Sequence, residues 1–185
     1  MIIEQSREQM HDAVALHTRA SIRWIRLSQA NVWGVPHVPR EIGTVAFDIN
    51  FKSAAFHREG EHLSFDTDFS FVLTSESNEK QPLLTVDCRF EAQYVLADGF
   101  DPSERQIEAF QAANAVFNCW PFFREYVQNT VVRMNFPPPP VPLLRIRRKP
   151  EEPMPGPELG DPAIASNQLT GSRKKVRVTQ RRHSP

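Results

Sequence analysis

Hydrophobic and polar residues alternate along three stretches of this chain, at residues 44–52, 62–74 and 83–96. The apolar positions of each stretch share one face: Val45, Phe47, Ile49 and Phe51; then Leu63, Phe65, Phe69, Phe71 and Leu73; then Leu84, Val86, Cys88, Phe90, Ala92, Tyr94 and Leu96. Alternation of this length is typical of strands with one buried and one solvated face. Polar, turn-rich segments at 57–62 and 75–82 join the stretches, so the pattern predicts an antiparallel sheet.

A fourth stretch with β character, residues 21–33, carries apolar side chains on two faces. Ile22 and Trp24 lie on one face, and Ile25 and Leu27 lie on the other, so we expect both to be partly covered. Residues 7–20 have apolar spacings of three and four and predict a short, weakly amphipathic helix. Residues 34–43 contain two glycines and two prolines and predict an extended crossover loop.

Two helices are expected after the strands. The first, over 101–117, begins with Asp101 as a cap, Pro102 at the first helical position and Glu104 in a box-like pattern. The second starts at Pro121, and one of its faces carries Phe123, Tyr126, Val127, Thr130, Val131 and Met134. Four prolines at 137–140 must end it. The predicted fold is therefore α+β: a four-stranded antiparallel sheet with two C-terminal helices on one face and a short N-terminal helix.

The composition changes near residue 149. The 185-residue chain suits one domain, which we place at 1–148. Residues 149–185 are rich in Pro, Gly and Ser and poor in aromatics, which predicts a disordered tail. The end of this tail is basic, with Arg173, Lys174, Lys175, Arg177, Arg181 and Arg182. Such tails act more often as solubilising or docking arms than as nucleic-acid binders, so we expect no nucleic acid as a partner.

The remaining bulk properties indicate a cytoplasmic protein. The formal net charge is zero and favours no particular partner. The two cysteines, Cys88 and Cys119, have no disulfide or CxxC pattern and are expected to be buried thiols in a reducing compartment. The N-terminus lacks the pattern of a secretory signal, and no apolar run approaches the roughly 20 residues that span a bilayer.

No motif in the sequence predicts catalysis, a metal or a cofactor. His57 and His62 flank a turn, but a metal site would need further ligands nearby. Asp66 and Asp68 share a strand face that is expected to be solvated. Cys119 precedes the expected helix start at Pro121, yet its aromatic neighbours favour a neutral thiol. Without a nucleophile–base pair, a phosphate loop or a ligand cluster, we expect that the protein is not an enzyme.

The aromatic content points to a surface instead. Trp33, in the expected loop, and Trp120, Phe122 and Phe123, at the expected helix start, exceed what two helices on one sheet can bury. They would form either an oligomer interface or an open groove for extended apolar peptide.

One segment resembles a known family. The run Trp120-Pro121-Phe122-Phe123-Arg124-Glu125, with Phe136-Pro137 after the helix, is similar to the start and end of the last helix of SecB export chaperones. Residues 19–33, RASIRWIRLSQANVW, are similar to the first strand of the SecB-like chaperones that accompany toxin–antitoxin systems in mycobacteria. The resemblance covers roughly residues 15–145.

The resemblance implies an ATP-independent chaperone that binds unfolded or nascent chains, for export or for holding. It implies sheets joined edge to edge in a dimer, and two such dimers in a tetramer. It also implies a peptide groove between the crossover loop and the last helix, for which it suggests Trp33, Val35, Trp120, Phe122, Tyr126 and Val131.

Two other functions remain open at this point. One is a dedicated chaperone of an antitoxin, and the other is a non-chaperone oligomeric binding or scaffold domain. The export chaperones present an acidic sheet surface and a characteristic tail to the SecA motor. Here the expected sheet surface mixes Asp66, Asp68, Asp87 and Glu91 with Lys52 and Arg89, and the tail ends basic, so docking on SecA is doubtful.

Overall fold

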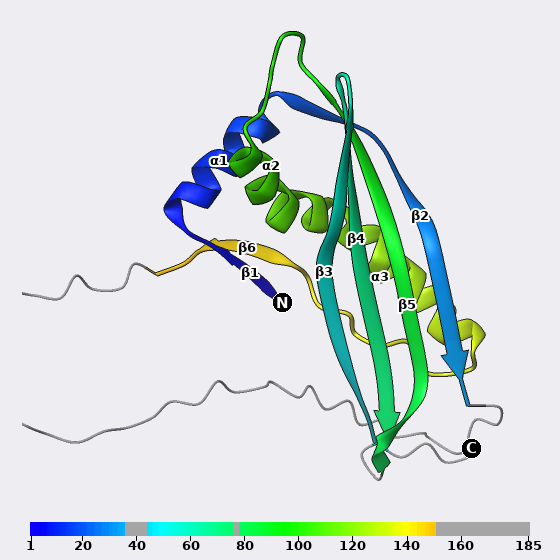
Figure 1. Ribbon diagram of the computed structural model, residues 1–185. Coiled ribbons are helices and arrows are strands. Elements are labelled where there is room, and N and C mark those ends of the chain that lie inside the picture. The colour runs from blue at the N-terminus through cyan, green and yellow to red at the C-terminus, as the bar shows by residue number, and fades with distance from the viewer. Residues whose placement is uncertain (36–43, 76–77, 151–185) are drawn as a thin grey trace, which may run out of the picture.

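Residues 1–35, 44–75 and 78–150 are described by a computed structural model of the chain. The elements, in order, are β1 (Ile2–Gln5), α1 (Arg7–His17), β2 (Ala20–Gly34), β3 (Val45–Glu59), β4 (His62–Ser75), β5 (Asn78–Leu96), α2 (Glu104–Phe110), the π-helical turn η1 (Gln111–Ala115), α3 (Val116–Arg133) and β6 (Arg145–Arg148). One antiparallel sheet has the strand order β2-β5-β4-β3, and β1 and β6 form a separate parallel pair (Figure 1). The predicted α+β class with a four-stranded antiparallel sheet is confirmed.

The alternating pattern correctly predicted which sheet face is buried. The apolar positions of β4 are at most 2% exposed, and all seven predicted for β5 are buried. Their partners on β3, from Val45 to Phe51, are partly buried against the same core. Asp66, Asp68 and Arg89 alternate with these residues and lie on the opposite face, which we call the outer face. The helices lie behind the sheet when it is viewed from the outer face (Figure 1).

Strand β2 corrects the prediction made for residues 21–33. Register shifts between Ile22 and Trp24 and between Leu27 and Gln29 mark two bulges, each of which adds one residue to the strand. Because of these insertions, apolar residues separated by three, two, three and two positions lie on one face of β2. All of them lie opposite buried residues of β5: Ile22, Ile25, Leu27, Ala30 and Val32. The apolar side chains therefore share the helix side, whereas Trp24 lies opposite Gln93 on the outer face.

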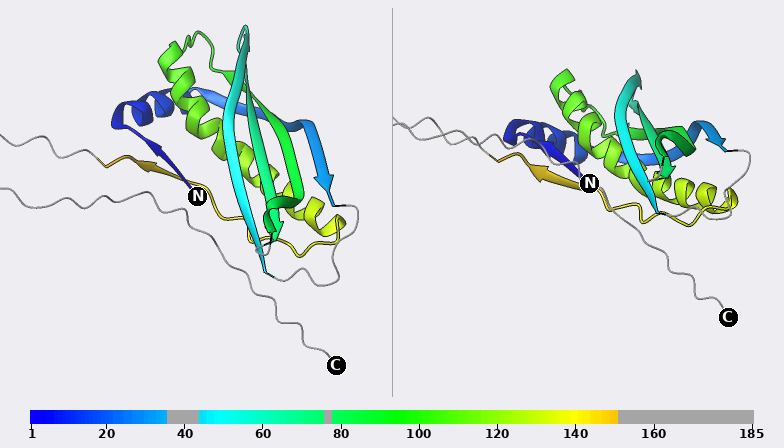
Figure 2. Two further views of the ribbon diagram at one scale, coloured as in Figure 1. Left: turned by 60° about the horizontal axis from the view of Figure 1, so that its bottom comes forward. Right: turned by 90° about the horizontal axis from the view of Figure 1, so that it is seen from below.

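The two predicted C-terminal helices form one continuous rod from Glu104 to Arg133 (Figure 2). Ser103, rather than Asp101, caps it through a capping box with Gln106. Pro121 lies inside α3 instead of starting a helix. A proline leaves the carbonyl four residues earlier without its N–H partner. Here that carbonyl belongs to the exposed residue Phe117, so water can satisfy it.

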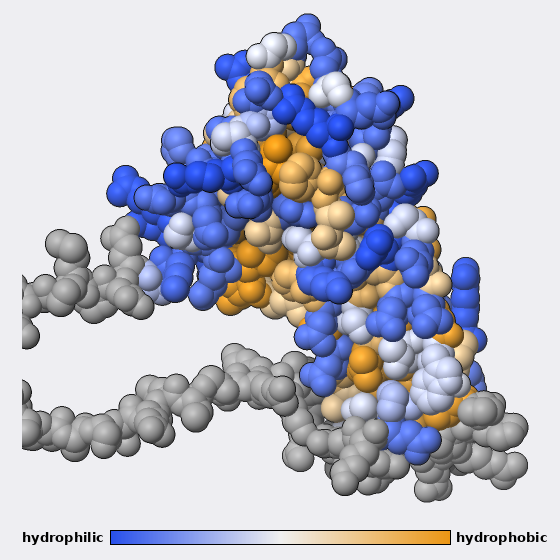
Figure 3. All heavy atoms as spheres, in the orientation of Figure 1, coloured by the Kyte–Doolittle hydropathy of each residue, from blue (hydrophilic) through white to orange (hydrophobic). Residues whose placement is uncertain are grey.

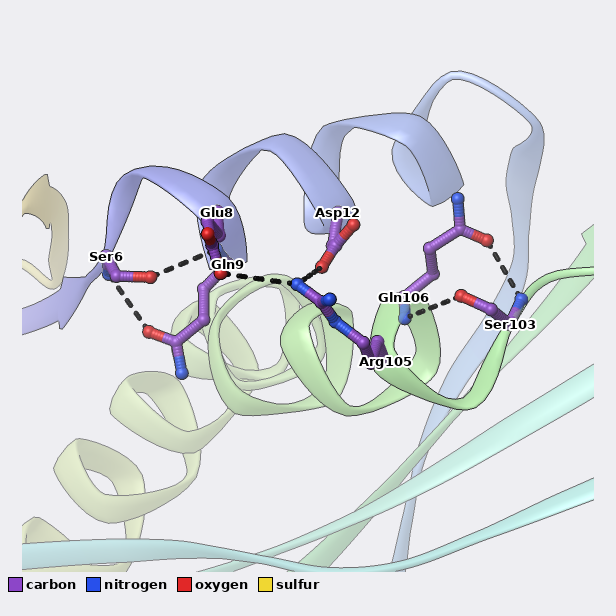
Figure 4. A network of polar contacts seen from close by, with 7 residues as sticks. All are labelled: Ser6, Glu8, Gln9, Asp12, Ser103, Arg105 and Gln106. Carbon is purple, nitrogen blue, oxygen red and sulfur yellow. Dashed lines mark hydrogen bonds and ion pairs between the residues drawn. The ribbon is translucent and has the colours of Figure 1, made fainter.

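Helix α1 packs beside α2 at one end of the sheet. Ser6 caps α1 in a capping box with Gln9, and the guanidinium of Arg105 on α2 lies 3.4 Å from Glu8 and 3.2 Å from Asp12 on α1 (Figure 4). Arg105 and Glu8 are exposed, so these ion pairs contribute little to stability.

A strap of nine residues, 136–144, follows α3, and five of them are proline. Asn135, with a φ of 62°, turns the chain out of the helix, and the N–H of Phe136 donates to the carbonyl of Val131 at 3.0 Å. The strap then runs back along α3. The indole N–H of Trp120 donates to the carbonyl of Pro142 at 3.0 Å, and Nε of Arg124 donates to the carbonyl of Val141 at 3.2 Å.

The strap leads into β6, which joins the first strand of the chain. The pairing with β1 is parallel, and the N–H of Lys149 extends it by donating to the carbonyl of Gln5 at 2.7 Å. The buried side chain of Gln5 donates to the carbonyl of Ala109 at 2.8 Å and so ties this pair to the end of α2. Four-residue strands are too short to give a periodic signal, so the sequence did not predict this pair. The crossover loop at 36–43 and most of the predicted tail, 151–185, lie outside the described residues.

Gln5→Ala is expected to lower the free energy of unfolding by about 1–3 kcal/mol, because it removes the buried hydrogen bond to the carbonyl of Ala109. Urea unfolding followed by circular dichroism measures the change. Glu4→Ala, at an exposed site on the same strand, is the matched control and should stay within about 0.5 kcal/mol of the wild type. Equal effects of the two substitutions would show that the Gln5 hydrogen bond does not stabilise the fold.

Candidate peptide-binding surface

The sheet is wider than the helix that covers it. An α-helix with its side chains is about 10–12 Å across, whereas the axes of the two outer strands, separated by three gaps of about 4.8 Å, lie roughly 14 Å apart. Helix α3 packs mainly on β5, β4 and β3. Each edge of the sheet therefore needs a further cover on the helix side, or its apolar residues stay exposed.

The proline strap covers the β3 edge. Trp120 bonds the strap on one side and meets Phe51 of β3 edge-on, with ring centroids 6.2 Å apart. Three apolar side chains of the strap, Phe136, Val141 and Leu144, are only 3–5% exposed. The strap therefore completes the core on this side of α3.

No comparable segment of the described chain covers the β2 edge. Ile22 is 50% exposed, Leu27 40% and Val32 37%, although all three lie on the helix side of the sheet. We call these three residues the β2 strip. They form a line of apolar side chains along a 15-residue edge strand.

One side of α3 faces this strip. Asn118, Phe122 and Tyr126 are four residues apart and lie on the same side of the helix. Nδ2 of Asn118 donates to the hydroxyl of Tyr94 on β5 at 2.8 Å, which directs this side toward β5. Because Trp120 and the strap lie on the β3 side of the helix, this side faces β2. Phe122 is 42% exposed, and Tyr126 is half-buried against the core. The β2 strip, Phe122 and Tyr126 together form the candidate surface, which we call the open flank.

Two residues suggested for the groove lie in the core instead. Trp120 is 3% exposed beneath the strap, and Val131 is fully buried. Both lie on the side of α3 that faces the sheet, so in this chain they position the helix and the strap. A ligand could reach them only if α3 or the strap moved.

The structure does not bring Trp33 together with Phe122. Trp33 pairs with Thr85, which alternates with the buried residues Leu84 and Val86, so Trp33 lies on the outer face, where it is 47% exposed. Val35 donates its N–H to the carbonyl of Leu83 and packs against the core at the end of β2.

The β2 strip was not among the residues suggested from the sequence. Its signal, apolar positions separated by three, two, three and two residues, becomes readable only when bulges are allowed.

The outer face is polar and holds a hollow of about 470 Å³. Arg89 makes two hydrogen bonds to the Asp68 carboxylate, at 2.6 and 3.0 Å, and these hold the pKa of that carboxyl below its usual value. Lys52 lies 3.6 Å from the same carboxylate, and Arg26 lies 2.7 Å from Glu91. Hydrophilic and apolar residues are mixed on this side of the molecule (Figure 3). The mixed charge expected for this face is confirmed.

The groups considered for chemistry have ordinary structural environments. Burial raises the pKa of the Cys119 thiol to about 12, which disfavours the thiolate that a nucleophile requires. Among the described residues, no group of three or more His, Cys, Asp or Glu side chains is placed to hold a metal ion. No helix in the same part of the chain is long and apolar enough to cross a membrane.

Alkylation of the cysteines should therefore be slow in the folded protein. Burial raises the pKa of Cys88 and of Cys119 to about 12, so both thiols stay protonated at pH 8. We expect iodoacetamide at pH 8 to label the native chain at least about a hundredfold more slowly than the urea-unfolded chain, measured by intact mass. Comparable rates in the two states would contradict the buried environment of both cysteines.

Comparison with known proteins agrees with this architecture. The chain is 30% identical over 141 residues to the SecB-like chaperones MT2006 and Rv1957 of two Mycobacterium tuberculosis strains, CDC 1551 / Oshkosh and ATCC 25618 / H37Rv. Each match covers 66% of this chain and 76% of the relative. No family model matches the chain.

The fold also has a solved relative. The structure of Mycobacterium tuberculosis Rv1957 SecB-like chaperone in complex with a ChAD peptide from the Rv1956 HigA1 antitoxin superposes with a TM-score of 0.64. At 23% identity, this match covers 74% of this chain and 99% of that one, and it shows the same fold. The sequence matches establish the family: this chain belongs to the SecB-like chaperones.

Proposed function

We propose that the protein is an ATP-independent holding chaperone that binds extended, unfolded polypeptide on its open flank. The exposed β2 strip supports this function most directly. Ile22, Leu27 and Val32 lie on the core side of the sheet, with no cover from the described residues, so a bound chain would complete the core. Covering one such side chain would contribute at most about 1.5–3 kcal/mol.

The mechanism is mass action. A chain bound on the open flank is withdrawn from folding and from aggregation, and it is released when its free concentration falls. Several shallow apolar contacts, less the entropy lost in ordering the client, give binding that tolerates many sequences. None of these steps needs a catalytic group or a nucleotide, in agreement with relatives that are named chaperones.

Self-association as a dimer of dimers is part of the proposal. In the described chain, β2 is an outer strand with an unpaired edge, which supports pairing with β2 of a second copy. Phe117 and Val132 are also exposed on α3, at 44% and 53%, and would be covered where the helices of two dimers meet.

A dedicated antitoxin chaperone is the second candidate. The solved relative contains a peptide from an antitoxin, which supports a client of that class here. An antitoxin held by the chaperone would keep the paired toxin inactive. General precursor proteins are the first candidate for the clients. The mixed charge of the outer face argues against docking on SecA.

The proposal places the protein in the cytoplasm, where unfolded chains are synthesised. Cys88 and Cys119 are both buried and unpaired, which suits a reducing compartment.

Phe122→Ser is expected to weaken the binding of an unfolded client about tenfold, because it removes an aromatic contact from the open flank. Fluorescence anisotropy with a labelled, permanently unfolded protein measures this change, and suppression of client aggregation should fall in parallel. The matched control is Leu143→Ser, at an exposed apolar residue of the strap that the proposed assembly does not use. Equal losses in both variants would remove the open flank as the binding surface.

Light scattering at micromolar concentration should give four times the 21.2 kDa mass of one chain. Ile22→Asp places a charge beside the β2 edge and is expected to lower the mass to that of a smaller species. A wild-type protein that stays monomeric would contradict the proposed assembly but not client binding by the single chain.

A further inference from the structure

The proline strap is an extended peptide already bound by this molecule. It is seated by the apolar side chains Phe136, Val141 and Leu144, which are nearly fully buried. Two side chains of α3, Trp120 and Arg124, donate to its carbonyls. The strap therefore lies along α3 without joining the four-stranded sheet.

This mode of binding suits proline. Five of the nine strap residues have no N–H, so they could not supply the donors of a β-ladder. Carbonyls remain available in a proline-rich chain, and these are the groups that the Trp120 and Arg124 side chains bond. Proline also favours an extended backbone before binding, which reduces the entropy lost on docking.

The open flank offers similar chemistry on the other side of α3. Its apolar floor is the β2 strip, as β3 and Phe51 form the floor beneath the strap. Its helical wall carries Tyr126 and, seven residues later, Arg133, which lie on the same side of α3. An aromatic residue with a polar donor and an arginine thus occur on both sides of the helix: Trp120 with Arg124, and Tyr126 with Arg133.

In the proposed dimer, the outer edge of β2 pairs with a second copy, so this edge is not free for a client to add a strand. The two bulges, at Arg23 and Ser28, also divide β2 into three short segments of regular register with β5: Ala20–Ile22, Trp24–Leu27 and Gln29–Gly34. The same bulges bring the apolar side chains to one face. β2 therefore presents a continuous line of apolar side chains to a client, whereas its backbone edge is occupied by the second copy in the proposed dimer.

We propose that the open flank selects extended apolar segments that contain proline, and that it holds them through side chains rather than by strand addition. The strap gives the pattern of such a ligand: apolar residues at relative positions 1, 6 and 9, as in Phe136, Val141 and Leu144, with prolines between them. This inference rests on the proposed function and names the substrate class of the same surface.

The experiment uses the full-length chain and a fluorescent peptide with the sequence of residues 136–146, FPPPPVPLLRI. We expect saturable binding in anisotropy, and a loss of at least about tenfold when the equivalents of Phe136, Val141 and Leu144 are serine. A peptide with alanine at every proline should bind at least about threefold more weakly, because its backbone is less extended before binding. Equal or tighter binding would show that proline is not selected, and the inference would be wrong.

Variants of the protein locate the bound peptide. Leu27→Ser, in the β2 strip, should weaken binding of the proline peptide about tenfold, whereas Leu143→Ser, exposed on the strap, should change it less than about twofold. If Leu27→Ser leaves the affinity for the peptide unchanged, the ligand binds elsewhere and the inference is wrong.

An unfolded client protein, tested beside the peptide, separates the two proposals. If the client binds and the proline peptide does not, the substrate class is wrong and the chaperone function stands. If neither binds, both fail.

Discussion

The contact between α3 and the middle of the sheet governs the rest of the structure. Phe123 stacks on Phe69 with ring centroids 4.6 Å apart and an interplanar angle of 14°, and Trp120 packs against both rings. This stack seats the helix over the central strands. Because the helix is narrower than the sheet, seating it there leaves both edges without cover. The strap closes one edge, and the exposed apolar surface lies at the other.

The regular parts of the fold were predictable from the sequence, whereas the irregular parts were not. Strict alternation identified the buried faces of β4 and β5, because a period of two can bury only one set of positions. The spacing in β2 depends on two bulges, and a pattern read without them divides its apolar residues over two faces. Pro121 suggested a helix start because proline is disfavoured inside a helix, yet it lies within α3, so the local preference did not decide where this helix begins.

The sequence predicted exposed aromatic residues near the last helix, but it could not place each of them on the surface or in the core. Phe122 and Tyr126, two of the residues that the family resemblance suggested, lie on the side of α3 that faces the β2 edge. Trp120 and Val131 carry similar sequence signals, but the direction of a helical side chain depends on where the helix sits on the sheet. Trp33 depends on the face of β2, which the bulges determine. The position of each of these side chains therefore follows from packing between elements that are distant in sequence.

The parallel pair of β1 and β6 has a consequence for how the chain reaches its native state in the cell. Its two strands are separated by nearly the whole domain, since Ile2 pairs with Arg145. A ribosome that adds 5–20 residues each second needs on the order of ten seconds to make the intervening chain. During that interval the first strand has no partner, and the buried amide of Gln5 cannot yet reach its final environment. During synthesis the hairpins of the sheet can therefore form early, but the pairing of β1 with β6 must wait until the end of the domain has been made.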